Sequence, residues 1–230
     1  MVSHPNYLEA CPLFVDVPLD MIKQDCPSVD IVPFPYGSVI YAQGQPLGEI
    51  FCVLDGQIKL SRLSRDGTEF TTGLLTTGDL FGAPLSNPPA FESPETASAK
   101  GQGIFLRVLV HEFRNLLLNH PALGLRVVEL LDRRKQQMER RLECFAFKRT
   151  EARLVEALRE LSSGFEARCE HGFGQHIRLS QQELADLVGA SRPVVSTILN
   201  RLRKDGVLGY SREYVCIREI DAIERILLSS

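Results

Sequence analysis

Apolar residues change their spacing along the chain, and each spacing predicts a different kind of element. Residues 1–30 contain short apolar turns that predict a helical lead-in. From Val29 to about Val110, short runs rich in Val, Ile, Leu and Phe are interrupted by glycine at near-regular intervals. Asp55-Gly56 and Asp66-Gly67 are typical of tight turns between strands. This region therefore predicts an antiparallel sandwich or barrel.

Residues 83–103 interrupt the pattern with a segment that contains four prolines. Because proline cannot donate a hydrogen bond to a neighbouring strand, we expect no regular central strand there. Residues 103–110 then predict the last strand of the region.

Helical spacing follows this strand. Residues 111–118 predict a short helix, and a long helix is expected from Pro121 to about Phe145. Steps of four and three, the a/d spacing of a coiled-coil seam, connect Gly124, Val128, Leu131, Lys135, Met138, Leu142 and Phe145. A helix packed on its own domain would also carry such a stripe, but the charged flanking residues favour a parallel dimer helix.

A hinge is expected at residues 146–149, followed by a helix from Thr150 with Leu154, Leu158 and Leu161 facing inward. Residues 164–178 predict a polar connection.

Residues 179–208 predict two helices joined by a very short turn. Ser180 with Glu183 fits a capping box at the start of the first helix. Gly189 is suited to end that helix, because glycine readily adopts the left-handed conformation. Ser191 is a second candidate N-cap, and Pro193 follows in the first turn.

The second of these helices divides into two faces at about 100° per residue. One face is apolar and consists of Val194, Val195, Ile198, Leu199 and Leu202. The other is polar and consists of Arg192, Pro193, Ser196, Thr197, Asn200, Arg201, Arg203 and Lys204. An ordinary helical hairpin would also have a wetted polar face. The short turn and the Arg, Ser, Thr and Asn side chains favour a helix–turn–helix that contacts DNA.

Two short strands are expected after this unit, at Leu208–Tyr210 and Tyr214–Ile217. They predict a two-stranded wing around residues 211–213, and residues 220–228 predict a closing helix.

Composition is that of an ordinary globular protein, with 44% hydrophobic and 24% charged residues among 230. The net charge of −3 is uneven, because residues 1–100 carry 5 Lys+Arg and 12 Asp+Glu. The mildly basic remainder fits a polyanionic partner. No apolar run approaches the ~18 residues of a membrane span, and the N-terminus lacks a signal-peptide pattern. We therefore expect a cytoplasmic protein without a membrane partner.

The six cysteines and five histidines are widely scattered, without a C-x-x-C pair. Zinc sites and iron–sulfur clusters usually group their ligands more tightly, so we expect no metal site and free, mostly buried thiols. No nucleophile elbow or phosphate loop is present, so we do not expect an enzyme.

The order of strands, long helix and winged helix–turn–helix resembles the CRP/FNR family of bacterial transcription regulators. The family's glycine pattern is matched by Gly37, Gly44, Gly56, Asp66-Gly67, Gly78-Asp79 and Phe81-Gly82. Residues 179–208 resemble the family's helix–turn–helix signature almost throughout. The likeness covers nearly the whole chain and implies an α+β fold in three parts. These are an antiparallel β-roll or jelly-roll sensor domain (1–120), a long dimerisation helix with a hinge (121–147) and a winged helix–turn–helix domain (148–230).

The resemblance also implies which residues meet DNA: Ser180, Gln181, Ser191, Arg192, Pro193, Ser196, Thr197 and Asn200. Ser180, Gln181 and Ser191 would meet phosphate, and Arg192 would bind O6 and N7 of a guanine. Pro193 departs from the Glu of many members, and Thr197 replaces a frequent Arg. We therefore expect an operator that differs from the family's commonest half-site.

The ligand positions depart further from the cyclic-nucleotide-binding members. Those members carry Gly-Glu after the last sheet motif and Arg-Ser later in the loop, whereas here Ala83 follows Gly82 and no arginine lies between Arg65 and Arg107. A buried phosphate without a cationic partner is costly, so we do not expect cyclic AMP. The cysteine cluster of the iron–sulfur oxygen sensors is also absent.

The residues that we assign to an effector pocket are Phe81, Gly82, Ala83, Leu85, Ser98, Arg134 and Met138. An apolar or weakly polar small molecule, haem and constitutive activity all stay open as explanations. Cysteine oxidation is a further alternative, with Cys144 near the hinge as its candidate, although a packed core thiol is the interpretation that we prefer for Cys144.

We therefore expect a sequence-specific DNA-binding transcription regulator, a homodimer through residues 121–145 on a palindromic operator in double-stranded DNA. A signal in the β-roll domain, from an unidentified small-molecule effector, would gate it, and RNA polymerase is a partner if the protein is an activator. The alternatives are a redox- or haem-responsive sensor of the same architecture, and a sensor that acts mainly on a protein partner.

Overall fold

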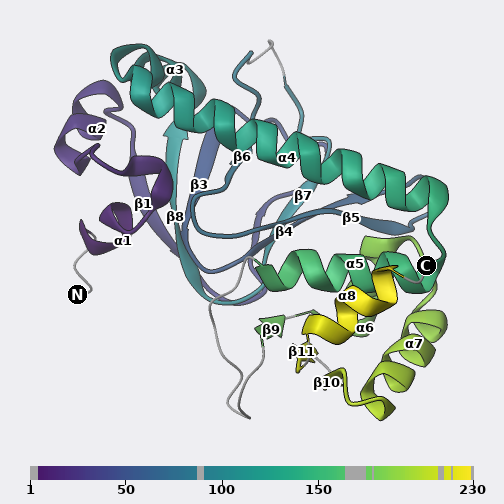
Figure 1. Ribbon diagram of the computed structural model, residues 1–230. Helices are drawn as coiled ribbons and strands as arrows, with labels where there is room; N and C mark the ends of the chain where they lie inside the picture. Colours follow the sequence, from purple (N-terminus) through teal and green to yellow (C-terminus); the bar gives the residue numbers. More distant parts are fainter. Residues whose placement is uncertain are drawn as a thin grey trace. The chain divides into compact units, whose positions relative to one another are not determined.

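The computed structural model divides into two compact units, Met1–Arg134 and Lys135–Ser230 (Figure 1). It describes residues 5–86, 91–163, 175–177, 179–211, 215–218 and 220–228. None of the helices within these ranges is long and apolar enough to cross a membrane.

The first unit begins with the expected helical lead-in. It consists of α1 (Pro5–Glu9), the short 3-10 helix η1 (Pro12–Phe14) and α2 (Leu19–Asp25). Leu13, Phe14 and Ile22 bury their side chains in the core of the unit, which explains the apolar turns of this segment.

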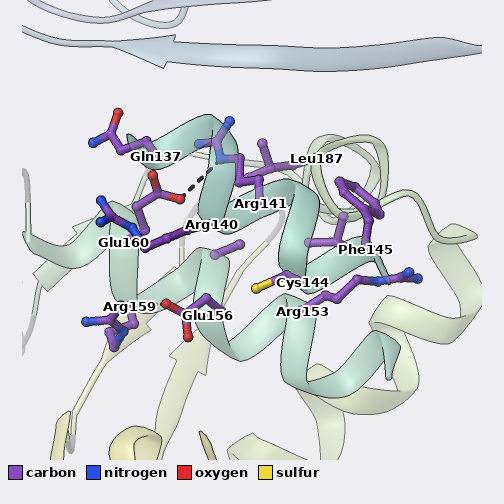
Figure 2. A pocket seen from close by; sticks show the side chains of 12 residues that line it. Gln137, Arg140, Arg141, Cys144, Phe145, Arg153, Glu156, Arg159, Glu160 and Leu187 are labelled. Atoms are coloured by element: carbon purple, nitrogen blue, oxygen red, sulfur yellow. Dashed lines mark hydrogen bonds and ion pairs between the residues drawn. The ribbon is translucent and has the colours of Figure 1, made fainter. Parts of the chain in front are cut away.

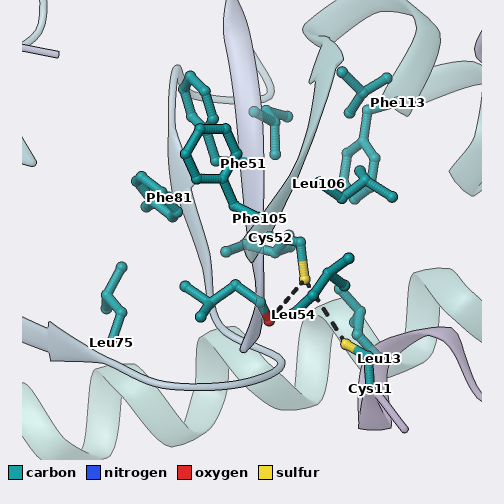
Figure 3. Close-up of a cluster of buried hydrophobic side chains, with 14 of the residues drawn as sticks. Cys11, Leu13, Phe51, Cys52, Leu54, Leu75, Phe81, Phe105, Leu106 and Phe113 are labelled. Carbon is teal, nitrogen blue, oxygen red and sulfur yellow. Dashed lines mark hydrogen bonds between the residues drawn. The ribbon is translucent and has the colours of Figure 1, made fainter. Parts of the chain in front are cut away.

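Two antiparallel sheets follow, as the glycine-punctuated runs predict. One has the strand order β1-β8-β3-β6 and the other β2-β7-β4-β5. The strands are β1 (Asp30–Phe34), β2 (Val39–Tyr41), β3 (Glu49–Asp55), β4 (Ile58–Leu63), β5 (Glu69–Leu75), β6 (Leu80–Gly82), β7 (Thr96–Ala99) and β8 (Gly103–Leu109). Aromatic rings fill the core, with the rings of Phe51 and Phe81 stacked at 5.0 Å between centroids and Phe105 edge-on to Phe51 at 5.3 Å (Figure 3).

Strand β7 corrects the expectation that residues 83–103 hold no regular central strand. It pairs with β2 on one side and β4 on the other, with Ser98 opposite Val39 and Lys59. The four prolines all precede Thr96, so the stretch Thr96–Ala99 has every N–H that a central strand needs.

Helices α3 (Val110–Asn119) and α4 (Pro121–Phe147) follow the last strand, as expected. Leu123, Val127 and Leu130 of α4 are buried. The predicted seam lies on a different face and is exposed, with Val128 62% and Leu142 70% accessible. The helix extends beyond the predicted end, so Ala146 and Phe147 of the expected hinge are helical.

The second unit adds α5 (Thr150–Ser163), α6 (Gln181–Val188), α7 (Arg192–Lys204) and α8 (Ile220–Leu228). Leu154, Leu158 and Leu161 are buried, as the helical spacing predicts.

The wing of this unit is larger than the predicted pair of strands. Its sheet has the order β10-β11-β9, from β10 (Leu208–Tyr210), β11 (Val215–Ile217) and β9 (Gln175–Ile177). Strand β9 lies in what we expected to be a polar connection. The remainder of that connection and the tip of the wing, including Tyr214, lie outside the described residues.

The cysteines agree with the expectation of free thiols at four positions, where Cys11, Cys26, Cys52 and Cys144 are free and buried. Cys216 is disulfide-bonded, which corrects the expectation for that residue. Cys169 lies outside the described residues.

Candidate functional site

The helix–turn–helix begins with the capping box expected at Ser180. The Ser180 hydroxyl accepts a hydrogen bond from the Glu183 N–H at 3.3 Å, and the Glu183 carboxylate accepts from the Ser180 N–H at 3.0 Å. These bonds satisfy two of the amide groups that the start of α6 would otherwise leave unpaired. They also occupy the polar atoms through which Ser180 would contact a phosphate.

Gly189 forms the turn between α6 and α7 in the left-handed conformation, with φ of 60°. A Cβ atom at this position would lie 2.8 Å from Cε1 of Phe145, near the end of α4. The guanidinium of Arg153 lies over the same ring, 5.1 Å from its centroid. Sequence spacing alone placed Phe145 at the seam, and only the tertiary structure shows that its ring supports the turn.

The inner face of α7 is buried as predicted at Val195, Ile198, Leu199 and Leu202. Val194 is the exception, because 44% of it is accessible. It follows Pro193 at the edge of the apolar arc, so the arc that anchors the helix is narrower than expected.

The N-terminal end of α7 presents exposed side chains at Ser191, Arg192 and Pro193. Ser191 is the N-cap residue, but its hydroxyl makes no capping hydrogen bond, and among the described residues Arg192 forms no ion pair. Thr197 is also exposed, and its hydroxyl donates to the Pro193 carbonyl at 3.0 Å.

Farther along the same face, the polar side chains hold the unit together. The Asn200 side-chain oxygen accepts from the Tyr210 hydroxyl at 2.7 Å and from Arg203 at 3.3 Å, and Arg203 lies over the Tyr210 ring. Arg201 forms an ion pair with Glu151 of α5. Lys204 remains exposed and without an ion pair within the described residues. Ser196 and Gln181 are half-buried.

The residues assigned to an effector pocket lie mostly in the first unit. Phe81 and Ala83 are buried, and the Ala83 N–H donates to the Glu49 carbonyl at 2.8 Å. Gly82, Leu85 and Ser98 are half-buried, and Gly82 pairs with Ile50 at the edge of β6. Met138 is 63% accessible and belongs to the second unit.

Arg134 of α4 places a guanidinium beside β6. Its guanidinium donates to the Leu80 carbonyl at 2.6 Å, and its other terminal nitrogen lies 3.9 Å from the position that a Cβ atom would take at Gly73. Tyr41, which sequence analysis did not single out, is buried nearby, and among the described residues its hydroxyl has no hydrogen-bond partner. Burial and then the charge of Glu95 raise the pKa of Tyr41, so its hydroxyl stays protonated.

A cavity of about 310 Å³ lies within the second unit, between the end of α4, α5 and the end of α6 (Figure 2). Arginines and glutamates line it, and Arg141 donates to Glu160 at 3.1 Å across it. Cys144 also lines this cavity, and burial raises the pKa of its thiol. The buried, protonated thiol agrees with the interpretation of Cys144 as a packed core residue.

Two family models match the chain, one in each unit. The cyclic nucleotide-binding domain matches residues 31–120, and the Crp-like helix-turn-helix domain matches residues 152–226.

The chain belongs to the CRP/FNR family of transcription regulators.

Known members of the CRP/FNR family resemble this chain over most of its length. The cyclic AMP receptor protein of Thermus thermophilus is 28% identical over 193 residues, which cover 84% of this chain and 86% of the relative. The global nitrogen regulator of Synechocystis sp. is 27% identical, with the same coverage of both chains. These two names indicate different signals, so membership alone does not identify an effector.

Solved structures of CRP/FNR proteins share the fold. A mutant of CooA from Carboxydothermus hydrogenoformans has a TM-score of 0.74 at 20% identity, covering 99% of this chain and 98% of CooA. The c-di-GMP-responsive global regulator CLP of Xanthomonas campestris has a TM-score of 0.71 at 23% identity, covering 84% of this chain and 95% of CLP. At these identities the likeness supports the α+β architecture and nothing finer.

Proposed function

We propose that the protein is a homodimeric, cytoplasmic transcription regulator that binds a two-fold-symmetric operator, with α7 in the major groove. The observation that carries this proposal is the polar end of α7, where Ser191 and Arg192 are exposed and their side chains form no bond to the part of the chain that the structure describes. These side chains stay available to a partner, whereas Asn200 and Arg201 are already bonded within the unit.

The roles within this end of α7 follow from side-chain chemistry. Arg192 binds O6 and N7 of a guanine, and the Ser191 hydroxyl donates to a phosphate. Pro193 has no side-chain acceptor, so it cannot bind the N4 amino group of a cytosine as a glutamate would. We therefore expect no selection for that cytosine in the operator. Ser196, Thr197 and Gln181 lie at the same surface and supply secondary contacts. Thr197 does so as an acceptor, because its hydroxyl already donates to the Pro193 carbonyl. Ser180 and Asn200 position the helices, because their side chains are already bonded.

Self-association uses the exposed stripe of α4. The seam predicted for residues 121–145 contains four apolar side chains that are between 49% and 70% accessible: Val128, Leu131, Met138 and Leu142. Burial of this stripe against a second copy removes apolar surface from water. The two copies of α7 then meet half-sites about 34–36 Å apart.

The effector would bind in the first unit, close to Phe81, Gly82, Ala83, Leu85 and Ser98. Arg134 and Tyr41 supply the polar groups there: a guanidinium with spare donors and a buried hydroxyl. We assign Met138 to the dimer interface of α4 and not to the pocket in the first unit. Cyclic AMP is disfavoured because β6 is followed by the buried Ala83 instead of a carboxylate. Haem and other small molecules stay open, and RNA polymerase is the further partner if the protein activates transcription.

Selection of operators from random double-stranded DNA, followed by binding measurements, tests the proposal. Arg192→Ala should weaken binding to the selected operator by about 5- to 150-fold, the equivalent of one bidentate base contact. Arg114→Ala is the matched control, because Arg114 is an exposed arginine of α3 in the other unit. If both variants lose affinity equally, or if selection returns no common sequence, the base-contact proposal is wrong.

A separate measurement addresses the effector. Native mass spectrometry and the visible spectrum of the protein purified from its own host identify an organic ligand or haem, and Arg134→Ala should reduce the occupied fraction. Operator binding by Arg134→Ala is also measured without ligand. Unchanged binding would show that the variant affects the effector site and not the DNA-binding surface.

A further inference from the structure

Two cysteines far apart in the sequence meet inside the first unit. The Sγ atoms of Cys11 and Cys52 lie 3.9 Å apart, in a hydrogen bond between residues 41 positions apart (Figure 3). Both side chains are buried, with 0% and 1% of each residue accessible. Neither the DNA-binding surface nor the proposed effector pocket uses them.

We propose that Cys11 and Cys52 are an oxidation site, at which a hydroperoxide converts the two thiols into an intramolecular disulfide. The sulfur atoms are already in contact, and a disulfide requires them to approach to about 2.05 Å. A disulfide is uncharged and apolar, so the buried surroundings do not oppose its formation as they would oppose two thiolates.

The two thiols differ in a way that assigns their roles. The hydrogen bond from the Cys52 thiol lowers the pKa of Cys11 to about 7, against the effect of burial, and the N–H groups of Leu13 and Phe14 act in the same direction. Burial raises the pKa of Cys52. Asp79 is the charged side chain that acts on both thiols, and it raises both pKa values. Cys11 is therefore the nucleophile and Cys52 the thiol that completes the disulfide.

The chemistry balances with one hydroperoxide. The Cys11 thiolate attacks the terminal oxygen, the O–O bond breaks, and the released alkoxide takes up a proton to leave as alcohol, or as water if the oxidant is hydrogen peroxide. Cys11 is then a sulfenic acid. The Cys52 sulfur attacks the Cys11 sulfur, the S–O bond breaks, and the hydroxide leaves as water with the proton of the Cys52 thiol. Two thiols lose two electrons, and the peroxide gains them.

The segment that carries Cys11 also borders a cavity, from which a hydroperoxide would approach. This cavity has a volume of about 680 Å³, and its walls include Leu8, Glu9 and Phe14, on both sides of Cys11 in the chain. Residues of α1 and η1, the two elements that flank Cys11 in the chain, thus border this cavity.

Oxidation should move η1 and leave the sheet in place. Cys52 lies in β3, where it pairs with Leu80 of β6 and Leu106 of β8. Cys11 precedes η1, whose Leu13 carbonyl accepts a hydrogen bond from Arg126 of α4 at 3.1 Å. Arg126 also donates to the Val15 carbonyl. A shift of Cys11 toward the sheet thus pulls on carbonyls that α4 holds.

Peroxide treatment of the reduced full-length chain tests the site directly. After alkylation of the remaining thiols under denaturing conditions, peptide mass spectrometry should find Cys11 linked to Cys52, with a mass lower by two hydrogen atoms. The rate should rise through a pH of about 7, where Cys11 ionises. The link should raise Tm by on the order of 10 °C, since it closes a long loop. A reductant should reverse both changes.

Two variants serve as controls. Cys52→Ser should leave a sulfenic or more oxidised Cys11 without the link. Cys26→Ser should leave the link intact, since Cys26 is a buried thiol whose pKa burial raises to about 12. The proposal is overturned if Cys11 and Cys52 of the wild-type chain stay fully alkylatable after treatment, or if either links to another cysteine instead. The mapping needs no DNA, so its failure would leave the proposed regulator function untouched.

Discussion

Helices α4 and α7 each leave one face uncovered, and the two faces differ in chemistry. The uncovered face of α4 is apolar, at Val128, Leu131, Met138 and Leu142. The uncovered end of α7 is polar, at Ser191 and Arg192. An apolar stripe gains free energy from leaving water, whereas polar side chains gain only from a partner that replaces their water with better-placed groups.

This comparison shows that exposure alone is a poor guide to a binding face. On α7, the basic residues Arg201 and Arg203 are exposed, as Arg192 is, yet Arg201 is paired with Glu151 and Arg203 lies over Tyr210. Only the side chains without an internal task are available to a partner. On α4 the apolar seam is selected because its exposed residues recur at coiled-coil spacing, whereas Leu125 and Phe147, which are also exposed, lie off it.

The largest expected effect comes from a charge on the α4 stripe. Leu142→Glu should raise the dimer dissociation constant by about 100-fold or more, because each copy would bury an unpaired carboxylate in the seam. Sedimentation velocity across a range of concentrations measures this. Gln136→Glu, which adds the same charge off the seam, should leave the dimer unchanged. Dimers of equal stability in both variants would mean that the stripe is not the interface.

A smaller effect should distinguish Lys204, which forms no ion pair within the described residues, from Arg201, which is paired with Glu151. Lys204→Ala should weaken operator binding several-fold and reduce the slope of log affinity against log salt by roughly 0.9, with Tm unchanged. Arg201→Ala should lower Tm, because it removes the ion pair with Glu151. Salt titrations by fluorescence anisotropy and thermal denaturation separate the two outcomes. A loss of stability in Lys204→Ala would contradict its assignment as free.

Asn200 should behave as a structural residue in spite of its position. Asn200→Ala should lower the free energy of unfolding by about 1 kcal/mol, because the half-buried Tyr210 hydroxyl loses its acceptor. Asn200→Asp keeps that oxygen, so it should retain most of the stability while it weakens DNA binding by charge repulsion. Chemical denaturation measures the first quantity. An Asn200→Ala variant of unchanged stability and weak DNA binding would identify Asn200 as a base-contacting residue.

The smallest expected effect is a dependence of stability on acid in the second unit. Burial raises the pKa of Glu156, but the hydrogen bond and charge of Arg159 and the charge of Lys148 outweigh it, and the pKa lies below its ordinary 4.5. A carboxylate with a lowered pKa stabilises the fold above that ordinary value and loses the effect as the pH falls through the folded-state pKa.

Thermal melts between neutral pH and pH of about 3 should therefore bring wild type and Glu156→Gln closer in Tm as the solution becomes more acidic. A difference in Tm that stays constant with pH would show that the ionised form of Glu156 contributes nothing.

The helix–turn–helix was predictable almost residue by residue because its signals are local. Ser180 and Glu183 cap a helix only three residues apart, and Gly189 ends it within the same short stretch. The helical period then places Ile198 and Leu199 inward without knowledge of any other element. The prediction that Val194 faces inward was wrong. Val194 lies at the edge of the apolar arc, where burial depends on the neighbouring elements and not on helical spacing alone.

The sheets were predictable as a class but not strand by strand. Strand β7 is four residues of Thr, Ala and Ser, and only its pairing with β2 and β4 makes it a strand. Strand β9 likewise depends on β11, which follows it by some forty residues. The position of Tyr41 near β6 and the meeting of Cys11 with Cys52 are long-range contacts for which no spacing in the sequence gives a signal, whereas Arg134 was assigned to the pocket through the family resemblance.

Two glycines that share the left-handed conformation should differ in mutational tolerance. Gly206 has φ of +78°, and a Cβ atom there would meet nothing within 4 Å among the described residues, so asparagine, which visits this conformation, should replace it at little cost. Gly189 also has a positive φ, and a Cβ atom there would in addition collide with the Phe145 ring. A library covering both positions should thus return substitutions at residue 206 and almost none at residue 189, unless Phe145 is shortened in the same molecule.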